Sequence, residues 1–203
     1  SLMTKTFYLI RHGDKVKTIG DPPLSEKGVA QALATAEYIA NHPVQQIIAS
    51  PILRTQQTAK YLADKLGFSV QTEPLLRERV NWGDDPEQSF EDFLAMWEKA
   101  SLERDWTPPV GDSSRNAGKR IQQVIETYNG SQKHIALITH GGVITDFVLN
   151  VFDNKTLDEA FPDFSKTKDN NVFECSLTIV EYNPINNNYE LKLLASIDHL
   201  ADL

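Results

Sequence analysis

Three short apolar segments of this chain end abruptly in polar or charged residues, and this repeated pattern constrains the fold more than any other feature. The three transitions read Leu9-Ile10-Arg11-His12-Gly13, Ile47-Ile48-Ala49-Ser50-Pro51 and Ala136-Leu137-Ile138-Thr139-His140-Gly141-Gly142. Short apolar runs bounded by such residues are typical of strands that a parallel sheet buries on both faces. Because the carboxyl ends of parallel strands lie along one edge of a sheet, we expect these polar residues to gather there.

Helical patterns alternate with the strands. We expect strands over residues 5–10, 45–49, 68–71 and 134–138, and helices that begin at Ser25, at Pro51, at Ser113 or Ser114, and at Gly142. The order strand, helix, strand, helix, strand indicates crossover connections between parallel strands. The sequence therefore predicts an α/β fold with three layers, α/β/α, around a mainly parallel, mixed central sheet.

The segment 84–111 differs from its surroundings, because carboxylates and aromatic residues are frequent in it and Pro108-Pro109 closes it. We expect a small helical cap insertion over the edge of the sheet. An apolar stripe at helical spacing runs through Phe90, Phe93, Leu94, Trp97 and Ala100. Such a stripe more often belongs to a hydrophobic core than to a ligand site.

The tail alternates between the two faces of a strand from Val172 to Ile179, and an Asn-rich turn at 183–188 follows. This pattern predicts a β-hairpin that ends near Ile197. The lone Cys175 falls on the apolar face of the first strand, where we expect it to pack in the core.

Length and composition favour one domain over residues 1–203, with Ser1 and Leu2 as an expression remnant before Met3. A net charge of -8 disfavours nonspecific binding to nucleic acid or to an anionic membrane. No apolar stretch approaches the roughly 18 residues of a membrane span, and no secretory signal is apparent. A single cysteine agrees with a reducing compartment, so we expect a cytoplasmic protein. The sequence gives no indication of the oligomeric state.

The expected sheet edge would gather two arginines, Arg11 and Arg54, and two histidines, His12 and His140. Guanidinium groups present a fork of donors that matches the oxygens of phosphate or carboxylate, so this set predicts an oxyanion site. Glycines beside the histidines, Gly141 among them, would allow the main chain and a ligand to approach closely.

A histidine in such a site can also react. Neighbouring arginines favour neutral imidazole, which is a competent nucleophile near pH 7. Phosphoryl transfer then needs a group that protonates the leaving alkoxide and later removes a proton from water. Glu78 follows the third expected strand and is our candidate, although Asp14, Asp84 and Asp85 are nearby carboxylates. The chain has no zinc-binding spacing, and we expect neither a metal ion nor another cofactor.

The sequence resembles the histidine phosphatase superfamily, the phosphoglycerate mutase-like group. The matching segments are residues 9–13, Pro23-Leu24-Ser25-Glu26-Lys27-Gly28 with Gln31-Ala32, residues 50–59, Glu78, residues 139–142 and His199-Leu200. They follow the family order over nearly the whole chain. The resemblance implies that His12 is the phosphorylated nucleophile, that Arg11, Arg54 and His140 hold the phosphate, and that Glu78 is the proton donor. It implies no metal ion.

Departures from the family pattern concern the substrate. The loop after Gly13 is short and lacks the Asn that many members carry, and the extended motifs of the glycolytic mutases are absent. We therefore expect a phosphoric monoester hydrolase acting on a small phosphorylated substrate, with Thr18 as a further substrate-binding residue. A phosphomutase using the same residues is the first alternative. A noncatalytic phospholigand-binding or signalling module is the second.

Overall fold

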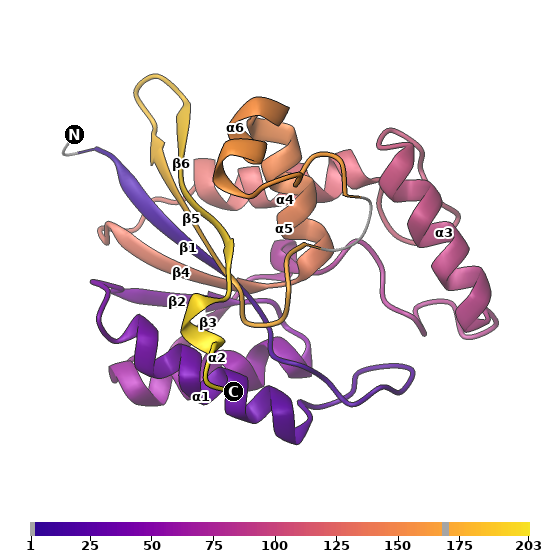
Figure 1. Ribbon diagram of the computed structural model, residues 1–203, viewed down its shortest axis with the longest axis horizontal. Coiled ribbons are helices and arrows are strands. Elements are labelled where there is room, and N and C mark those ends of the chain that lie inside the picture. The colour runs from indigo at the N-terminus through magenta and orange to yellow at the C-terminus, as the bar shows by residue number, and fades with distance from the viewer. Residues whose placement is uncertain (1–2, 168–170) are drawn as a thin grey trace.

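A six-stranded sheet with the order β3-β2-β4-β1-β5-β6 forms the centre of the computed structural model, which describes residues 3–167 and 171–203 (Figure 1). The strands are β1 (Lys5–Arg11), β2 (Gln46–Ala49), β3 (Val70–Thr72), β4 (His134–Thr139), β5 (Leu177–Asn183) and β6 (Asn188–Ser196). The first four strands are parallel, whereas β5 pairs antiparallel with β1, and β6 antiparallel with β5. The predicted mixed, mainly parallel sheet is confirmed.

Helices cover both faces of this sheet (Figure 1). One face carries α1 (Glu26–Ile39) and α2 (Leu53–Leu66), and the other carries α4 (Ser114–Glu126), α5 (Gly141–Val151) and α6 (Asn154–Ala160). Successive residues of β1 enter two different cores: Phe7 and Leu9 pack toward α4 and α5, whereas Tyr8 and Ile10 pack toward α1 and α2. Burial on both faces explains why this strand is a continuous apolar run. The three-layer architecture is confirmed.

The boundaries of two elements differ from prediction for local reasons. The second helix begins at Leu53 rather than at Pro51, and the Leu53 N–H donates to Asp21 Oδ1 at 3.0 Å, so a carboxylate from a distant loop satisfies the helix terminus. The third strand begins at Val70 rather than at Phe68. Gly67 adopts a left-handed conformation, and the Phe68 N–H still donates to the Ala63 carbonyl, which extends the helix cap into the expected strand.

The hairpin of the tail is confirmed, but its first strand begins later than predicted, at Leu177. Cys175 has a left-handed backbone (φ 57°), and its N–H donates to the carbonyls of Arg11 and His12. The segment before Leu177 is therefore a turn that holds the end of β1. Cys175 is fully buried, as expected, and burial raises the pKa of its thiol to about 12. Helix α6 was not predicted.

Helix α3 (Phe90–Leu102) is the only helix in the described part of residues 84–111, and it lies at the periphery, beyond the end of α5 (Figure 1). The expectation that its apolar stripe forms core is wrong for half of its length. Ala100 is buried, but Phe90 and Leu94 are each 48% exposed. Too little of the fold lies beyond α3 to cover that face. Among the described residues, no helix combines the length and apolar character needed to cross a bilayer.

Candidate active site

Two buried histidines lie together at the carboxyl end of the central strands. His12 follows β1 and His140 follows β4, and because these strands are parallel neighbours, their ring centroids are 5.3 Å apart. Only 3% of His12 and none of His140 is exposed. The prediction that these strand ends meet at one edge is confirmed.

Hydrogen bonds define which nitrogen of His12 carries the proton. His12 Nδ1 lies 2.7 Å from the Gly13 carbonyl oxygen, which can only accept, so Nδ1 must donate. His12 Nε2 lies 3.2 Å from Arg54 Nε, which can only donate, so Nε2 must present its lone pair. The structure therefore places a neutral imidazole whose Nε2 electron pair accepts a hydrogen bond from the Arg54 cation.

Burial is the main reason that His12 stays neutral. It lowers the pKa of His12 well below its usual value, and the positive charges of Arg11 and Arg54 lower it further. The arginine effect was predicted from the sequence, but the larger effect of burial depends on the packing around the strand ends. Burial likewise lowers the pKa of His140 well below its usual value.

Positive charge is concentrated around His12 although the chain as a whole is acidic. Arg54, in the first turn of α2, is buried and donates from Nη2 to Asn81 Oδ1 at 2.7 Å. Arg11 Nη1 donates to the Val172 carbonyl at 2.8 Å, while its Nε is buried and has no hydrogen-bond partner among the described residues. Lys15 adds a third cation, whose pKa is lowered by burial and by the charges of Arg54 and Arg11.

His140 presents a second unused polar atom. Its Nε2 lies 2.9 Å from Ser50 Oγ, whereas its buried Nδ1 has no hydrogen-bond partner in the described part of the chain. If the Ser50 hydroxyl donates to Nε2, the proton of His140 is on Nδ1 and is available to an anion. Burying such a donor is costly unless a partner arrives, so the arrangement suits an oxyanion ligand.

Glu78 lies beside the start of α5, close to the histidines. Its Oε2 accepts a hydrogen bond from the Gly142 N–H and its Oε1 one from the Arg79 N–H, both at 2.9 Å. The nearby aspartates have other partners. Asp14 accepts from the Ser25 hydroxyl at the start of α1, and Asp84 accepts from the Asn81 N–H. Glu78 therefore lies at the start of α5, against the residue two positions after His140, and its negative charge opposes the lowering of the Arg54 pKa by burial.

Two buried arginines hold the segment that carries Glu78. Arg120, on α4, donates to the carbonyls of Leu75, Arg77 and Glu78 at 2.7, 2.7 and 3.1 Å. Arg79 forms a bidentate ion pair with Asp146 at 2.9 and 3.0 Å. Burial raises the pKa of Asp146 to about 6, and the positive charge and hydrogen bonds of Arg79 oppose that rise.

The predicted glycines contribute close backbone contacts. A β-carbon added to Gly13 would lie 2.7 Å from the Gly28 carbonyl oxygen, so only glycine lets the start of α1 approach the residue after His12. Gly141 is buried at the first position of α5, next to His140. Thr18 is not part of this cluster. It is exposed, and its described hydrogen bond joins its own N–H to the Val16 carbonyl.

Several supporting residues were not identified from the sequence. Asp146 could have been identified, because it is a single carboxylate in an otherwise apolar face of a helix. A buried carboxylate in such a place requires a partner of opposite charge. Ser50 was expected at the sheet edge because it follows a strand, but nothing in the sequence marked it as a partner of His140. The positions of Asn81 and Arg120 had no signal, because polar residues at these places are equally compatible with solvated loops and helix faces.

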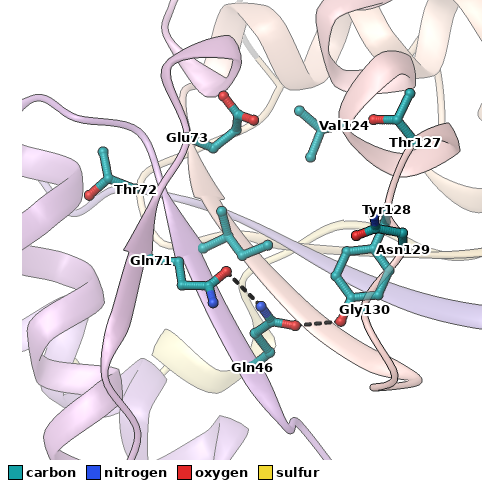
Figure 2. Close-up of a pocket in the computed structure, with 10 residues that line it drawn as sticks. Gln46, Gln71, Thr72, Glu73, Val124, Thr127, Tyr128, Asn129 and Gly130 are labelled. Atoms are coloured by element: carbon teal, nitrogen blue, oxygen red, sulfur yellow. Dashed lines mark hydrogen bonds between the residues drawn. The ribbon is translucent and has the colours of Figure 1, made fainter.

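Among the described residues, no group of three or more His, Cys, Asp and Glu side chains is arranged to hold a metal ion. A hollow of about 320 Å³ lies elsewhere, between β3 and the end of α4 (Figure 2). Gln46 bridges Gln71 and Tyr128 within it by hydrogen bonds. The described lining contains no histidine or arginine, so the hollow is separate from the cluster around His12.

Solved structures with the same fold include a mycobacterial glucosyl-3-phosphoglycerate phosphatase and a phosphoserine phosphatase from Entamoeba histolytica. The first is 20% identical with a TM-score of 0.65 and covers 95% of this chain and 99% of its own. The second, in complex with 3-phosphoglyceric acid, is 21% identical with a TM-score of 0.71 and covers 96% and 98%. At such identities the likeness shows the fold.

A curated relative, the probable phosphoglycerate mutase GpmB of Yersinia pestis, is 33% identical over 132 residues. The match spans 59% of this chain and 61% of the relative. The profile of the histidine phosphatase superfamily (branch 1) matches residues 7–192, and the protein belongs to this family.

Proposed function

We propose that the protein is a metal-independent phosphomonoester hydrolase that works through a phosphohistidine intermediate on His12. The observation that carries this proposal is the fixed lone pair on the buried, neutral Nε2 of His12, surrounded by arginines. Neutral imidazole is the nucleophilic form, and a preorganised donor set favours the charge that develops on a transferring phosphoryl group.

In the proposed reaction, Arg11, Arg54 and the Nδ1–H of His140 bind the phosphoryl oxygens. Arg54 releases His12 Nε2 as it turns to the phosphate, and Nε2 attacks phosphorus while the bond to the leaving oxygen breaks. Protonated Glu78 donates its proton to that oxygen, and the alcohol departs. Glu78 then takes a proton from a water molecule, whose oxygen attacks phosphorus while the bond between phosphorus and His12 Nε2 breaks. This step releases inorganic phosphate and restores neutral His12.

The test is hydrolysis of an aryl phosphate, with and without a chelator, by the wild type and His12→Ala. The wild type should release phosphate and the variant should not. Turnover in the wild type that the chelator abolishes would contradict the metal-independent mechanism, and equal rates for the two proteins would contradict the role of His12.

Glu78→Gln tests the proton donor separately. An aryl leaving group needs less protonation than an alkyl one, so the variant should lose more activity on an alkyl phosphate, within the roughly 10²–10⁴-fold that general acid catalysis supplies. Equal losses on both esters would count against Glu78 as the acid. Asp84→Asn is the matched control, because this carboxylate caps a turn.

A phosphomutase is the second candidate, and the relative named as a probable phosphoglycerate mutase favours it. Such an enzyme retains the phosphoryl group on histidine long enough to return it to a reoriented substrate. Incubation with 3-phosphoglycerate distinguishes the two activities. Free phosphate is the product expected of the hydrolase, whereas conversion to 2-phosphoglycerate without loss of phosphate would establish the mutase.

A further inference from the structure

Four aromatic rings form a continuous row that ends at the proposed proton donor. Trp82 lies 4.9 Å from Phe90, Phe90 lies 6.4 Å from Phe93, and Phe93 lies 6.0 Å from Trp97, measured between ring centroids. Trp82 precedes α3, and the other three rings lie along one side of that helix. We call Trp82, Phe90, Phe93 and Trp97 the aromatic row.

The inner end of the aromatic row touches the site. A β-carbon added to Gly142 would lie 2.7 Å from Glu78 Oε1 and 2.5 Å from the Trp97 ring, so both groups reach the same point at the start of α5. The Trp97 ring also stacks on the Arg79 guanidinium, 4.1 Å from its centroid, and Arg79 directly follows Glu78. Trp97 is therefore in the immediate surroundings of the carboxylate.

The outer end of the row is open to solvent. Phe90 is 48% exposed, whereas the Trp82 indole is fixed by donating from Nε1 to the Gln88 carbonyl at 3.2 Å. The loop that follows His12 lies against the same end, because the Gly20 N–H donates to the Trp82 carbonyl at 3.1 Å. That loop exposes two apolar side chains of its own, Val16 and Ile19. Exposed apolar groups gathered beside a reactive site indicate a ligand surface.

We infer that the aromatic row binds an apolar or aromatic leaving group of the phosphomonoester substrate. This inference rests on the proposed function, because a general acid must contact the leaving oxygen, and the remainder of the alcohol must then lie beside Glu78. The side chain next to Glu78 on the α3 side is Trp97, and the row continues outward from it. Positive charge binds the phosphoryl end of the substrate, and aromatic rings bind the other end.

The experiment compares two ligands that differ only in a phenyl ring. Phenylpropylphosphonate and propylphosphonate cannot be hydrolysed. Calorimetry therefore measures their binding whether or not the protein is a hydrolase. Burial of one aromatic ring corresponds to roughly tenfold or more in affinity, so the phenyl ligand should bind at least about tenfold more tightly. Phenylpropyl and propyl phosphate, whose alcohols are similarly poor leaving groups, should show a similar ratio in kcat/KM.

A matched pair of variants locates the effect. Phe90→Ala and Leu102→Ala each remove an exposed apolar side chain, 48% and 52% exposed, from opposite ends of α3. Phe90→Ala, and more strongly Phe93→Ala, should reduce the preference for the phenyl ligand several-fold, whereas Leu102→Ala should leave it unchanged. None of the three changes touches the phosphate-binding groups, so the affinity for propylphosphonate should be the same in the wild type and the three variants.

Equal binding of the two phosphonates would overturn the inference, as would a preference that survives both Phe90→Ala and Phe93→Ala. If the enzyme hydrolyses propyl and phenylpropyl phosphate equally well, the proposed function stands and the aromatic row has another role. If neither ester is hydrolysed but the phenyl preference in binding is present and sensitive to Phe93→Ala, the surface is established and the hydrolase proposal fails.

Discussion

Replacing Arg120 by lysine should impair the proposed acid without touching the substrate. Arg120 is 8% exposed, and its guanidinium donates to four acceptors: the carbonyls of Leu75, Arg77 and Glu78, and Asp112 Oδ2 at 2.9 Å. A lysine ammonium is a compact donor that cannot reproduce this fork. The segment carrying Glu78 would lose the bonds that fix its backbone.

The magnitude follows from the lost bonds. Hydrogen bonds to a charged group contribute about 1.5–3 kcal/mol each, so the loss of one or two gives a decrease of about 1.5–6 kcal/mol in the free energy of unfolding. A displacement of about 1 Å at the reacting groups can cost roughly 100-fold in rate. Because only the acid is displaced, kcat should fall by about that factor on an alkyl phosphate and much less on an aryl phosphate.

Arg115→Lys is the matched control, because it makes the same change on the same helix. The Arg115 side chain is 40% exposed and pairs with Asp105 at the surface, where an ion pair contributes little. Both variants would be assayed on the two esters and unfolded in urea. If Arg120→Lys lost the same fraction of activity on both esters, or behaved like Arg115→Lys, the positioning role would be refuted.

Two further predictions concern stability. The pKa values of His12 and His140 are lowered in the folded state, so unfolding takes up protons below about pH 6.5. As the pH is lowered further, the free energy of unfolding should therefore decrease by about 1.4 kcal/mol per pH unit for each histidine. His12→Gln should lower that slope by one histidine's share in urea unfolding, and parallel pH curves would contradict it. Asp146→Asn leaves the Arg79 charge buried without a partner and should lower the free energy of unfolding, measured in urea, by about 3–5 kcal/mol. The double variant Arg79→Met and Asp146→Leu should recover most of that stability. A double variant no more stable than Asp146→Asn would contradict this prediction.

The sequence predicted the sheet and the meeting of His12 with His140 because both depend on a short-range signal. An apolar run that stops at a polar residue marks a strand end, and parallel pairing brings such ends together. The same reasoning found Arg54, which follows β2 by a few residues.

The parts that were not predicted depend on contacts between distant segments. The late start of β5 follows from Cys175 binding the carbonyls at the end of β1. The hydrogen bonds from Arg120 to the Glu78 segment join residues more than 40 positions apart. They could not be predicted, because a charged residue on a helix can equally face solvent. The exposed stripe of α3 was misjudged because periodicity shows that one face is apolar but cannot show whether anything covers it.

The central claim is that His12 Nε2 becomes covalently phosphorylated. The most direct measurement is mass spectrometry of the protein quenched during turnover of an aryl phosphate, with the modified peptide sequenced. A phosphoryl group that is labile in acid, located on His12, and absent from His12→Ala is the predicted result. Steady turnover with no phosphoryl group on His12 at any time point, in a Glu78→Gln background that slows its hydrolysis, would contradict the account.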